Sequence, residues 1–146
     1  MNVFTLSNAQ ARRIFLDRHA LHETPKGPTR RADVHAMITR LGFVQLDSIN
    51  TVARAHDLIL HSRMPQYKSA DLWRLLQKDR AVFEHGTHDA AIIPIAFYPH
   101  WYLRRQRDAE RLRARWRTNR PEGFEPQLKS VLRHIRTHGP STSSDV

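Results

Sequence analysis

The sequence of 146 residues contains no cysteine, which excludes disulfide bonds and thiolate metal sites. No window approaches the roughly 18 consecutive apolar residues that a membrane helix requires. The N-terminal segment also lacks an apolar run of signal-peptide length. Together these absences predict a soluble, cytoplasmic protein with no membrane partner.

Acidic residues are scarce relative to basic ones, with 14 Asp and Glu against 24 Lys and Arg, for a net charge of +10. Arginine predominates over lysine, and its planar guanidinium suits phosphate contacts. This balance favours a polyanionic partner, above all nucleic acid in the nucleoid, over a basic enzyme without such a partner. No long basic stretch has the continuous apolar face that binding to a membrane surface requires.

Helical periodicity and turn residues divide the first two-thirds of the chain into short elements. Ser7 and Gln10 fit a capping box at the start of a helix over 8–21. From residue 30 onward, the predicted order is a helix capped by Thr29 and ended by Gly42, a strand at 43–47, helices at 51–63 and 70–79, and strands at 81–85 and 89–93.

This order predicts a mainly α fold with a short β-hairpin wing, a winged helix-turn-helix over residues 1–94. The recognition helix is then 70–79, capped by Ser69, and the wing is 81–93, with Gly86 near its tip.

A long connecting helix is predicted over about 95–117, within a connecting segment at 95–118. Its basic face is either a solvated surface or a phosphate-contacting one; it consists of Arg104, Arg107, Arg111 and Arg115. Residues 119–146 read as a linker and the incomplete start of a second winged helix. The expected parts are a helix with Pro126 in its first turn, ended by Gly139, then a strand at 141–143 and a new helix from Ser144. This predicts a truncated product or a fragment of a longer protein.

The strand at 43–47 carries an amide and a carboxylate on one face. Because alternate strand residues share a face, Val44 and Leu46 are expected in the core, and Gln45 and Asp47 on the other side. A carboxylate beside DNA is repelled by the phosphates, so its presence on this face requires an explanation. Either Asp47 or Ser48 caps the following helix, or Asp47 stabilises a cationic transition state and positions water.

The same stretch resembles the winged-helix DNA glycosylases of the AlkZ/YcaQ type, bacterial repair enzymes whose active-site signature is Gln, apolar, then Gln or Asp. Gln45-Leu46-Asp47 matches the Gln–apolar–Asp branch. The segments that carry the resemblance are 42–50 (GFVQLDSIN), 52–56 (VARAH), 62–63 (SR), 83–85 (FEH), 88–91 (HDAA), Pro94, 98–99 (YP) and 139–142 (GPST). The chain departs from the family in being much shorter and in lacking an aromatic residue within 85–88 (HGTH).

The resemblance implies excision of alkylated purines or unhooking of interstrand crosslinks by hydrolysis of the N-glycosidic bond, with no cofactor and no obligate protein partner. Asp47 is then expected to stabilise the oxocarbenium-like sugar and to be available to draw a proton from the water, and Gln45 is expected to orient that water. A non-enzymatic winged-helix regulator and an inactive truncated relative remain open as alternatives. Whether the base is displaced from the duplex is also open.

Seven further side chains are candidate contacts to double-stranded DNA: Arg54, His56, Arg63, Lys68, Arg74, His88 and Arg104. His56 and Arg63 lie seven residues apart and share a helix face, although a surface pair or a core-edge histidine is the alternative. A metal site is not expected, because His85, His88 and Asp89 in a hairpin turn have no obvious distant further ligand.

Overall fold

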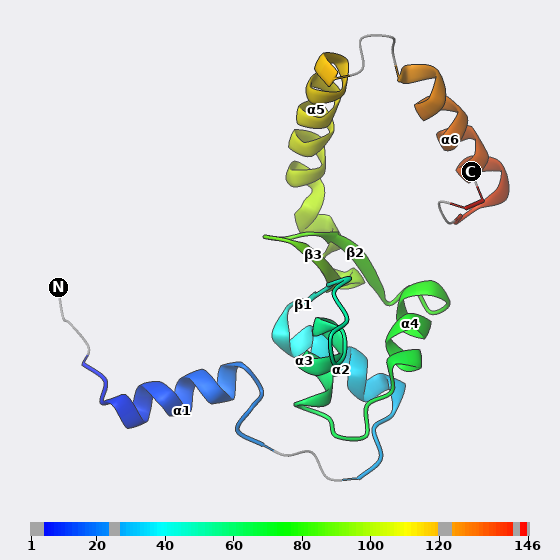
Figure 1. Cartoon of the computed structure of the whole chain (residues 1–146). Coiled ribbons are helices and arrows are strands. Elements are labelled where there is room, and N and C mark those ends of the chain that lie inside the picture. The colour runs from blue at the N-terminus through cyan, green and yellow to red at the C-terminus, as the bar shows by residue number, and fades with distance from the viewer. Residues whose placement is uncertain (1–4, 24–26, 120–123, 142–143, 146) are drawn as a thin grey trace. The chain divides into compact units, whose positions relative to one another are not determined.

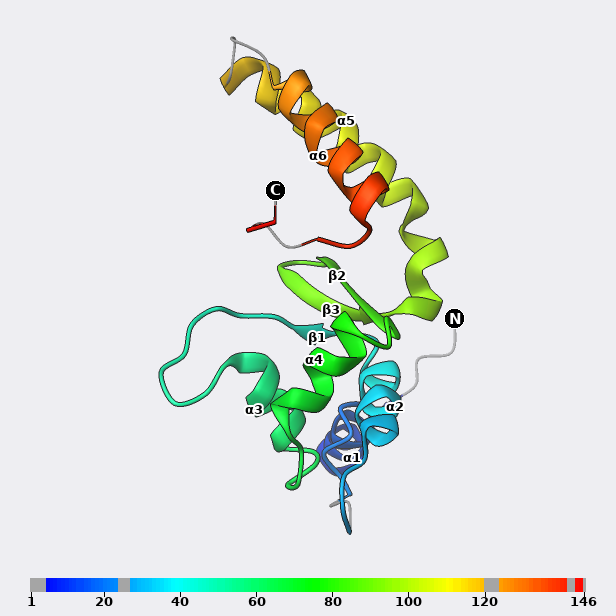
Figure 2. The same cartoon turned by 90° about the vertical axis from the view of Figure 1, so that its right-hand side faces the viewer.

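The computed structural model describes residues 5–23, 27–119, 124–141 and 144–145, and it divides into two units, Met1–Pro99 and His100–Val146. The first unit is mainly helical around a small three-stranded antiparallel sheet (Figures 1 and 2). This arrangement is that of the predicted winged helix. Over the described residues, no helix is both long enough and apolar enough to cross a membrane.

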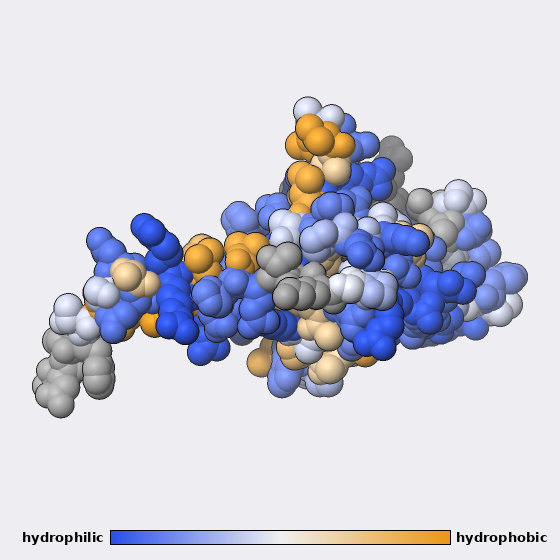
Figure 3. Space-filling model, turned by 90° about the horizontal axis from the view of Figure 1, so that it is seen from below, coloured by the Kyte–Doolittle hydropathy of each residue, from blue (hydrophilic) through white to orange (hydrophobic). Residues whose placement is uncertain are grey.

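Helix α1 (Asn8–Arg18) begins with the predicted capping box, in which the backbone N–H of Ser7 donates to Gln10 Oε1 at 2.9 Å. It ends three residues before the predicted Leu21, because Ala20 adopts a left-handed φ of 53°. This turn lets the N–H of Leu21 reach back to the carbonyl of Leu16 at 2.8 Å. Helix α1 leaves apolar side chains on its surface, visible as orange atoms along the arm at the left of Figure 3.

Helix α2 (Arg31–Leu41) buries Val34 and Ile38 and ends at Gly42, whose φ of 88° suits glycine. The predicted cap at Thr29 is wrong by one residue. The N-cap is Arg30, and its backbone N–H donates to Asp33 Oδ2 at 2.8 Å. The acidic side chain thus satisfies a backbone donor at this helix start, where no hydroxyl does so.

Strand β1 (Val44–Gln45) and helix α3 (Ala55–His61) are both shorter than predicted. The pairing of β1 continues one residue further, because the N–H of Leu46 donates to the carbonyl of Ala90 at 2.8 Å. The chain then leaves the sheet and forms a loop that closes with a bridge between Asn50 and Arg54. The prediction of a helix over 51–63 was therefore wrong at both ends.

Helix α4 (Ser69–Gln77) and the strands β2 (Val82–Gly86) and β3 (Ala90–Pro94) complete the winged helix. Ser69 is the first helical residue and not the cap, which is Lys68. The sheet order is β1-β3-β2, so β3 lies between the wing strand β2 and the strand β1, which carries Gln45. Gln45 is paired with Ala91, and Glu84 with Ile92.

One hydrophobic core joins the helices to the sheet. Helices α2, α3 and α4 and all three strands contribute to it; its buried members are Val34, Ile38, Val44, Leu60, Met64, Tyr67, Leu72, Leu75, Val82 and Ile92. Because Val44 belongs to this core, the strand that carries Gln45 is anchored from the opposite face.

The second unit contains helix α5 (Tyr102–Asn119) and helix α6 (Glu125–His138). The single helix predicted over 95–117 is wrong, since a 3₁₀ segment, η1 (Ile95–Trp101), contains Pro99 and precedes α5. Helix α6 has Pro126 in its first turn and ends at Gly139, as predicted. Ser144 and Asp145 are not helical, whereas most of the strand predicted at 141–143 lies outside the described residues.

Candidate functional site

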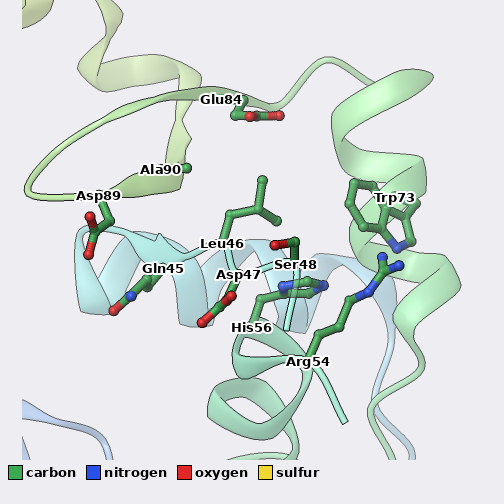
Figure 4. A pocket seen from close by; sticks show the side chains of 10 residues that line it. All are labelled: Gln45, Leu46, Asp47, Ser48, Arg54, His56, Trp73, Glu84, Asp89 and Ala90. Carbon is green, nitrogen blue, oxygen red and sulfur yellow. The ribbon is translucent and has the colours of Figure 1, made fainter. Parts of the chain in front are cut away.

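An open pocket of about 560 Å³ lies beside β1 in the first unit (Figure 4). Its walls come from four places: the β1 strand and the loop after it, the start of α3, helix α4, and the hairpin of β2 and β3. The lining residues are Gln45, Leu46, Asp47, Ser48, Arg54, His56, Trp73, Glu84, Asp89 and Ala90. Four of the nine side chains predicted for the site therefore meet in one cavity.

Strand β1 and its continuation place Gln45 and Asp47 in this pocket together. Val44 is buried and Gln45 is exposed, as strand alternation requires. Leu46 packs partly against the core but also lines the pocket, because regular strand geometry ends at Gln45. The predicted shared face of the amide and the carboxylate is thus present in the structure.

Asp47 holds its own loop with one oxygen, since Oδ1 accepts a hydrogen bond from the N–H of Ile49 at 2.8 Å. Neither Asp47 nor Ser48 caps α3, whose N-cap is Arg54. Among the described residues, Oδ2 of Asp47 has no hydrogen-bond partner. The loop bond therefore fixes the carboxylate and leaves its second oxygen available to the pocket.

His56 is the buried polar side chain of the pocket wall, with only 1% of its surface exposed. The edge-to-face contact with Trp73 has ring centroids 5.7 Å apart. Burial lowers the pKa of His56; Asp57 and Asp47 oppose this effect, and Arg54 reinforces it. At neutral pH the ring is therefore uncharged, which makes it a poor phosphate contact and leaves the DNA-contact prediction for His56 without support.

The electrostatics of the pocket differ from those of the chain as a whole. Three carboxylates line it, those of Asp47, Glu84 and Asp89, together with the single cation Arg54. The whole chain carries a net charge of +10. An acidic hollow on a basic protein suits a ligand that is a polyanion overall and cationic at one point.

The remaining predicted contacts lie outside the pocket. The Arg63 guanidinium donates from Nε to the carbonyl of His19 at 2.8 Å and from Nη1 to that of Ile59 at 2.7 Å, so it ties the end of α1 to α3. Lys68, Arg74 and His88 are exposed, on or near α4 and the hairpin. Arg104 belongs to the second unit and lies 3.6 Å from Asp108. Their roles in DNA binding stay predictions.

Sequence reasoning did not name Trp73, Glu84 and Asp89 as members of one site with Asp47. The sequence contains one indirect signal. Glu84 and Asp89 flank the predicted hairpin tip, and pairing of that hairpin with the strand at 43–47 places them beside Gln45. No periodicity argument predicts that β3, rather than β2, is the neighbour of β1. Within the described ranges, no three His, Asp or Glu side chains gather closely enough to hold a metal ion.

No solved structure matches the chain. The model of one protein family, DNA glycosylase AlkZ-like, matches residues 38–146, which include β1, the whole pocket and both helices of the second unit. The chain therefore belongs to the AlkZ-like DNA glycosylase family.

Proposed function

We propose that this protein removes alkylated, positively charged purines from double-stranded DNA in the nucleoid by hydrolysing the N-glycosidic bond, with Asp47 and Gln45 as its catalytic residues. The observation that carries the proposal is the placement of these two side chains in one pocket, with Oδ2 of Asp47 unpartnered among the described residues. Membership in a DNA glycosylase family supplies the reaction type.

The reaction depends more on an ionised carboxylate, which stabilises the sugar cation, than on a general acid that protonates the leaving base. A purine alkylated at N7 already carries a positive charge, so it departs with the bonding electron pair without prior protonation. The sugar left behind develops oxocarbenium character, which an ionised carboxylate stabilises. At about 4 Å and an effective dielectric near 20 this interaction is worth about 4 kcal/mol, or roughly a thousandfold in rate.

Gln45 has the complementary task of orienting the water. Its side-chain amide both donates and accepts hydrogen bonds, so it can hold a water molecule in a fixed direction. The exposed position of Gln45, at the end of a strand anchored by buried Val44, suits that task.

The exposed rim of the pocket favours bulky lesions as further substrates. Gln45, Arg54, Glu84 and Asp89 are all exposed, so the cavity is bordered by solvent and not enclosed. A crosslinked purine cannot rotate fully into a closed pocket, whereas an open one admits it with little displacement. We therefore include unhooking of interstrand crosslinks in the proposed activity.

A non-enzymatic DNA-binding module is the second candidate, and the bond from Ile49 to Asp47 favours it. In that case Asp47 is a loop-forming residue and has no chemical role. The two candidates differ in turnover and not in DNA affinity, so the test must measure both.

Single-turnover release of N7-methylguanine from a duplex provides this test, with the wild type beside Asp47→Asn and Gln45→Ala. We expect Asp47→Asn to lose about a thousandfold in rate and Gln45→Ala about tenfold to a hundredfold, with duplex affinity retained. Salt-sensitive binding without release by the wild type would refute the glycosylase proposal and leave the binding module.

A further inference from the structure

The side chain of His56 is buried without a hydrogen-bond partner for either of its ring nitrogens, Nδ1 and Nε2, among the described residues. Only 1% of its surface is exposed. A buried polar group left unsatisfied costs about 1–3 kcal/mol. Phenylalanine would fill a similar space without that cost. A histidine here therefore indicates a partner that the pocket receives from outside.

Beside the ring lies a hydrogen-bonded pair, of which Tyr67 is buried and Asp57 is partly exposed. Tyr67 donates its hydroxyl to Asp57 Oδ1 at 2.8 Å, which fixes the carboxylate. The other oxygen, Oδ2, lies 3.7 Å from His56 Nε2. This negative charge favours the tautomer with the proton on Nε2, so that Nδ1 carries the lone pair. The arrangement favours Nδ1 as the acceptor nitrogen of the neutral imidazole.

The ring also belongs to the same cavity as the catalytic pair. His56 and Asp47 both line the pocket, and Figure 4 shows the His56 ring between the side chains of Asp47 and Arg54. The negative charge of Asp47 is close enough to act on the pKa of His56. Trp73 closes the other side of the ring with its edge-to-face contact.

We propose that His56 is a third catalytic residue, which accepts a proton from the attacking water at Nδ1 while Asp47 stabilises the sugar cation. This inference rests on the proposed glycosylase function and gives to His56 the water proton that the sequence-based expectation gave to Asp47. The neutral, oriented and buried imidazole is a better proton acceptor than an ionised carboxylate that must keep its charge for the sugar.

The reaction balances with these groups alone. The C1′–N9 bond of the alkylated purine breaks, and its electron pair leaves with the base, which becomes neutral. The water oxygen forms a bond to C1′, and one water proton passes to Nδ1 of His56. The imidazolium is stabilised by the carboxylates of Asp57 and Asp47, and its proton returns to solvent once the product has left.

A pH dependence follows from the groups around the ring. Asp57 and Asp47 raise the pKa of His56, and Arg54 and burial lower it, with burial the largest effect. Tyr67 is bound to Asp57, and Glu84 and Asp89 face the same cavity from the hairpin. The net shift is downward from 6.5, so the neutral form persists at pH 7 and excision is lost only as the pH falls through the lowered pKa.

The test compares His56→Phe and His56→Gln with His61→Gln, a control at an exposed histidine of the same helix. We expect His56→Phe to melt at or above the wild-type temperature, to bind the methylated duplex normally, and to excise about a hundredfold more slowly. His56→Gln should also be slow, and its rate should no longer fall with acid as the wild-type rate does. His61→Gln should match the wild type.

Two results would overturn the inference while leaving the glycosylase function intact. One is excision by His56→Phe within about threefold of the wild type while Asp47→Asn is inactive. The other, decisive if His56→Phe fails to fold, is a His56→Gln pH profile that keeps the wild-type acid limb. A wild type that binds the methylated duplex and releases no base would instead overturn the proposed function and this inference with it.

Discussion

The two units of this protein differ in how much of their interior is packed. The first unit has a continuous core in which Val34, Ile38, Leu60, Leu72 and Ile92 are fully buried. In the described part of the second unit, Phe124 is the one buried hydrophobic residue, packed edge-to-face on Trp116 with ring centroids 5.1 Å apart. Rigid packing positions reactive groups to within fractions of an ångström. The chemistry is therefore expected in the first unit.

Charge distinguishes the pocket of the first unit from helix α5 of the second. The pocket of the first unit is lined by three carboxylates and one arginine. Helix α5 instead carries a dense series of cations, at positions 104, 105, 107, 111, 113, 115 and 117. Asp108 lies within ion-pair distance of Arg104 and Arg111. From this comparison we expect catalysis and phosphate binding to use different surfaces, so that mutation can separate them.

The largest expected contrast is in stability. Ile92→Ala removes a fully buried side chain from β3, and we expect it to lower the free energy of unfolding by about 3 kcal/mol. Ile135→Ala in α6 removes a side chain that is 42% exposed, and its cost should stay below about 1 kcal/mol. Urea unfolding followed by circular dichroism measures both. Equal costs would mean that the second unit has a core as well.

The next contrast is in the salt dependence of DNA binding. Replacing both Arg107 and Arg115 by Ala removes two cations from α5, and we expect the slope of log K against log salt to become shallower by about two. Arg31→Ala is the matched control, because that arginine already pairs with Asp79 at 2.8 Å. Titration of a labelled duplex at several salt concentrations gives the slopes. An unchanged slope in the double variant would mean that the basic face of α5 is a solvated surface that does not contact phosphates.

The smallest expected effect concerns the start of α2. Hydrogen bonds from the Arg30 side chain and backbone lower the pKa of Asp33 below its usual 3.8. A lowered pKa in the folded state means that Asp33 stabilises the fold above its unfolded pKa. That contribution is lost as the pH falls through the folded value. Asp33→Asn should therefore lower the melting temperature slightly at pH 7 and have no effect in strong acid. A difference that persists in acid would assign the effect to geometry and not to charge.

The sequence predicted most of the first unit because its signals are local. The apolar stripe of α2, the glycine at its end and the strand-like hairpin each depend on neighbours within a few residues. The errors lie at the ends of the helices, where the periodic pattern does not fix the boundary. Ala20 ends α1 early in a left-handed turn that no residue preference indicates, and Pro99 is held in a 3₁₀ segment that a periodic pattern reads as α-helix.

For the site, the motif predicted Gln45 and Asp47, and both side chains line the pocket of the structure, while their catalytic role stays a proposal. It could not identify Trp73, Glu84 and Asp89, whose presence in the pocket depends on how α4 and the hairpin pack beside β1. His56 shows the same limit. Its spacing from Arg63 predicted a shared face toward DNA, with a surface pair or a core-edge histidine as the alternatives. The structure buries His56, as in the second alternative, and commits Arg63 to carbonyl groups of His19 and Ile59.

The most direct test of the expected separation between catalysis and phosphate binding uses one methylated duplex. It measures the rate of base release and the duplex affinity for Asp47→Asn and for the Arg107→Ala, Arg115→Ala double variant. We predict that Asp47→Asn binds as tightly as the wild type or tighter and releases base about a thousandfold more slowly. The double variant should bind more weakly and, at saturating protein, release base at the wild-type rate. Excision by Asp47→Asn at the wild-type rate would contradict the account.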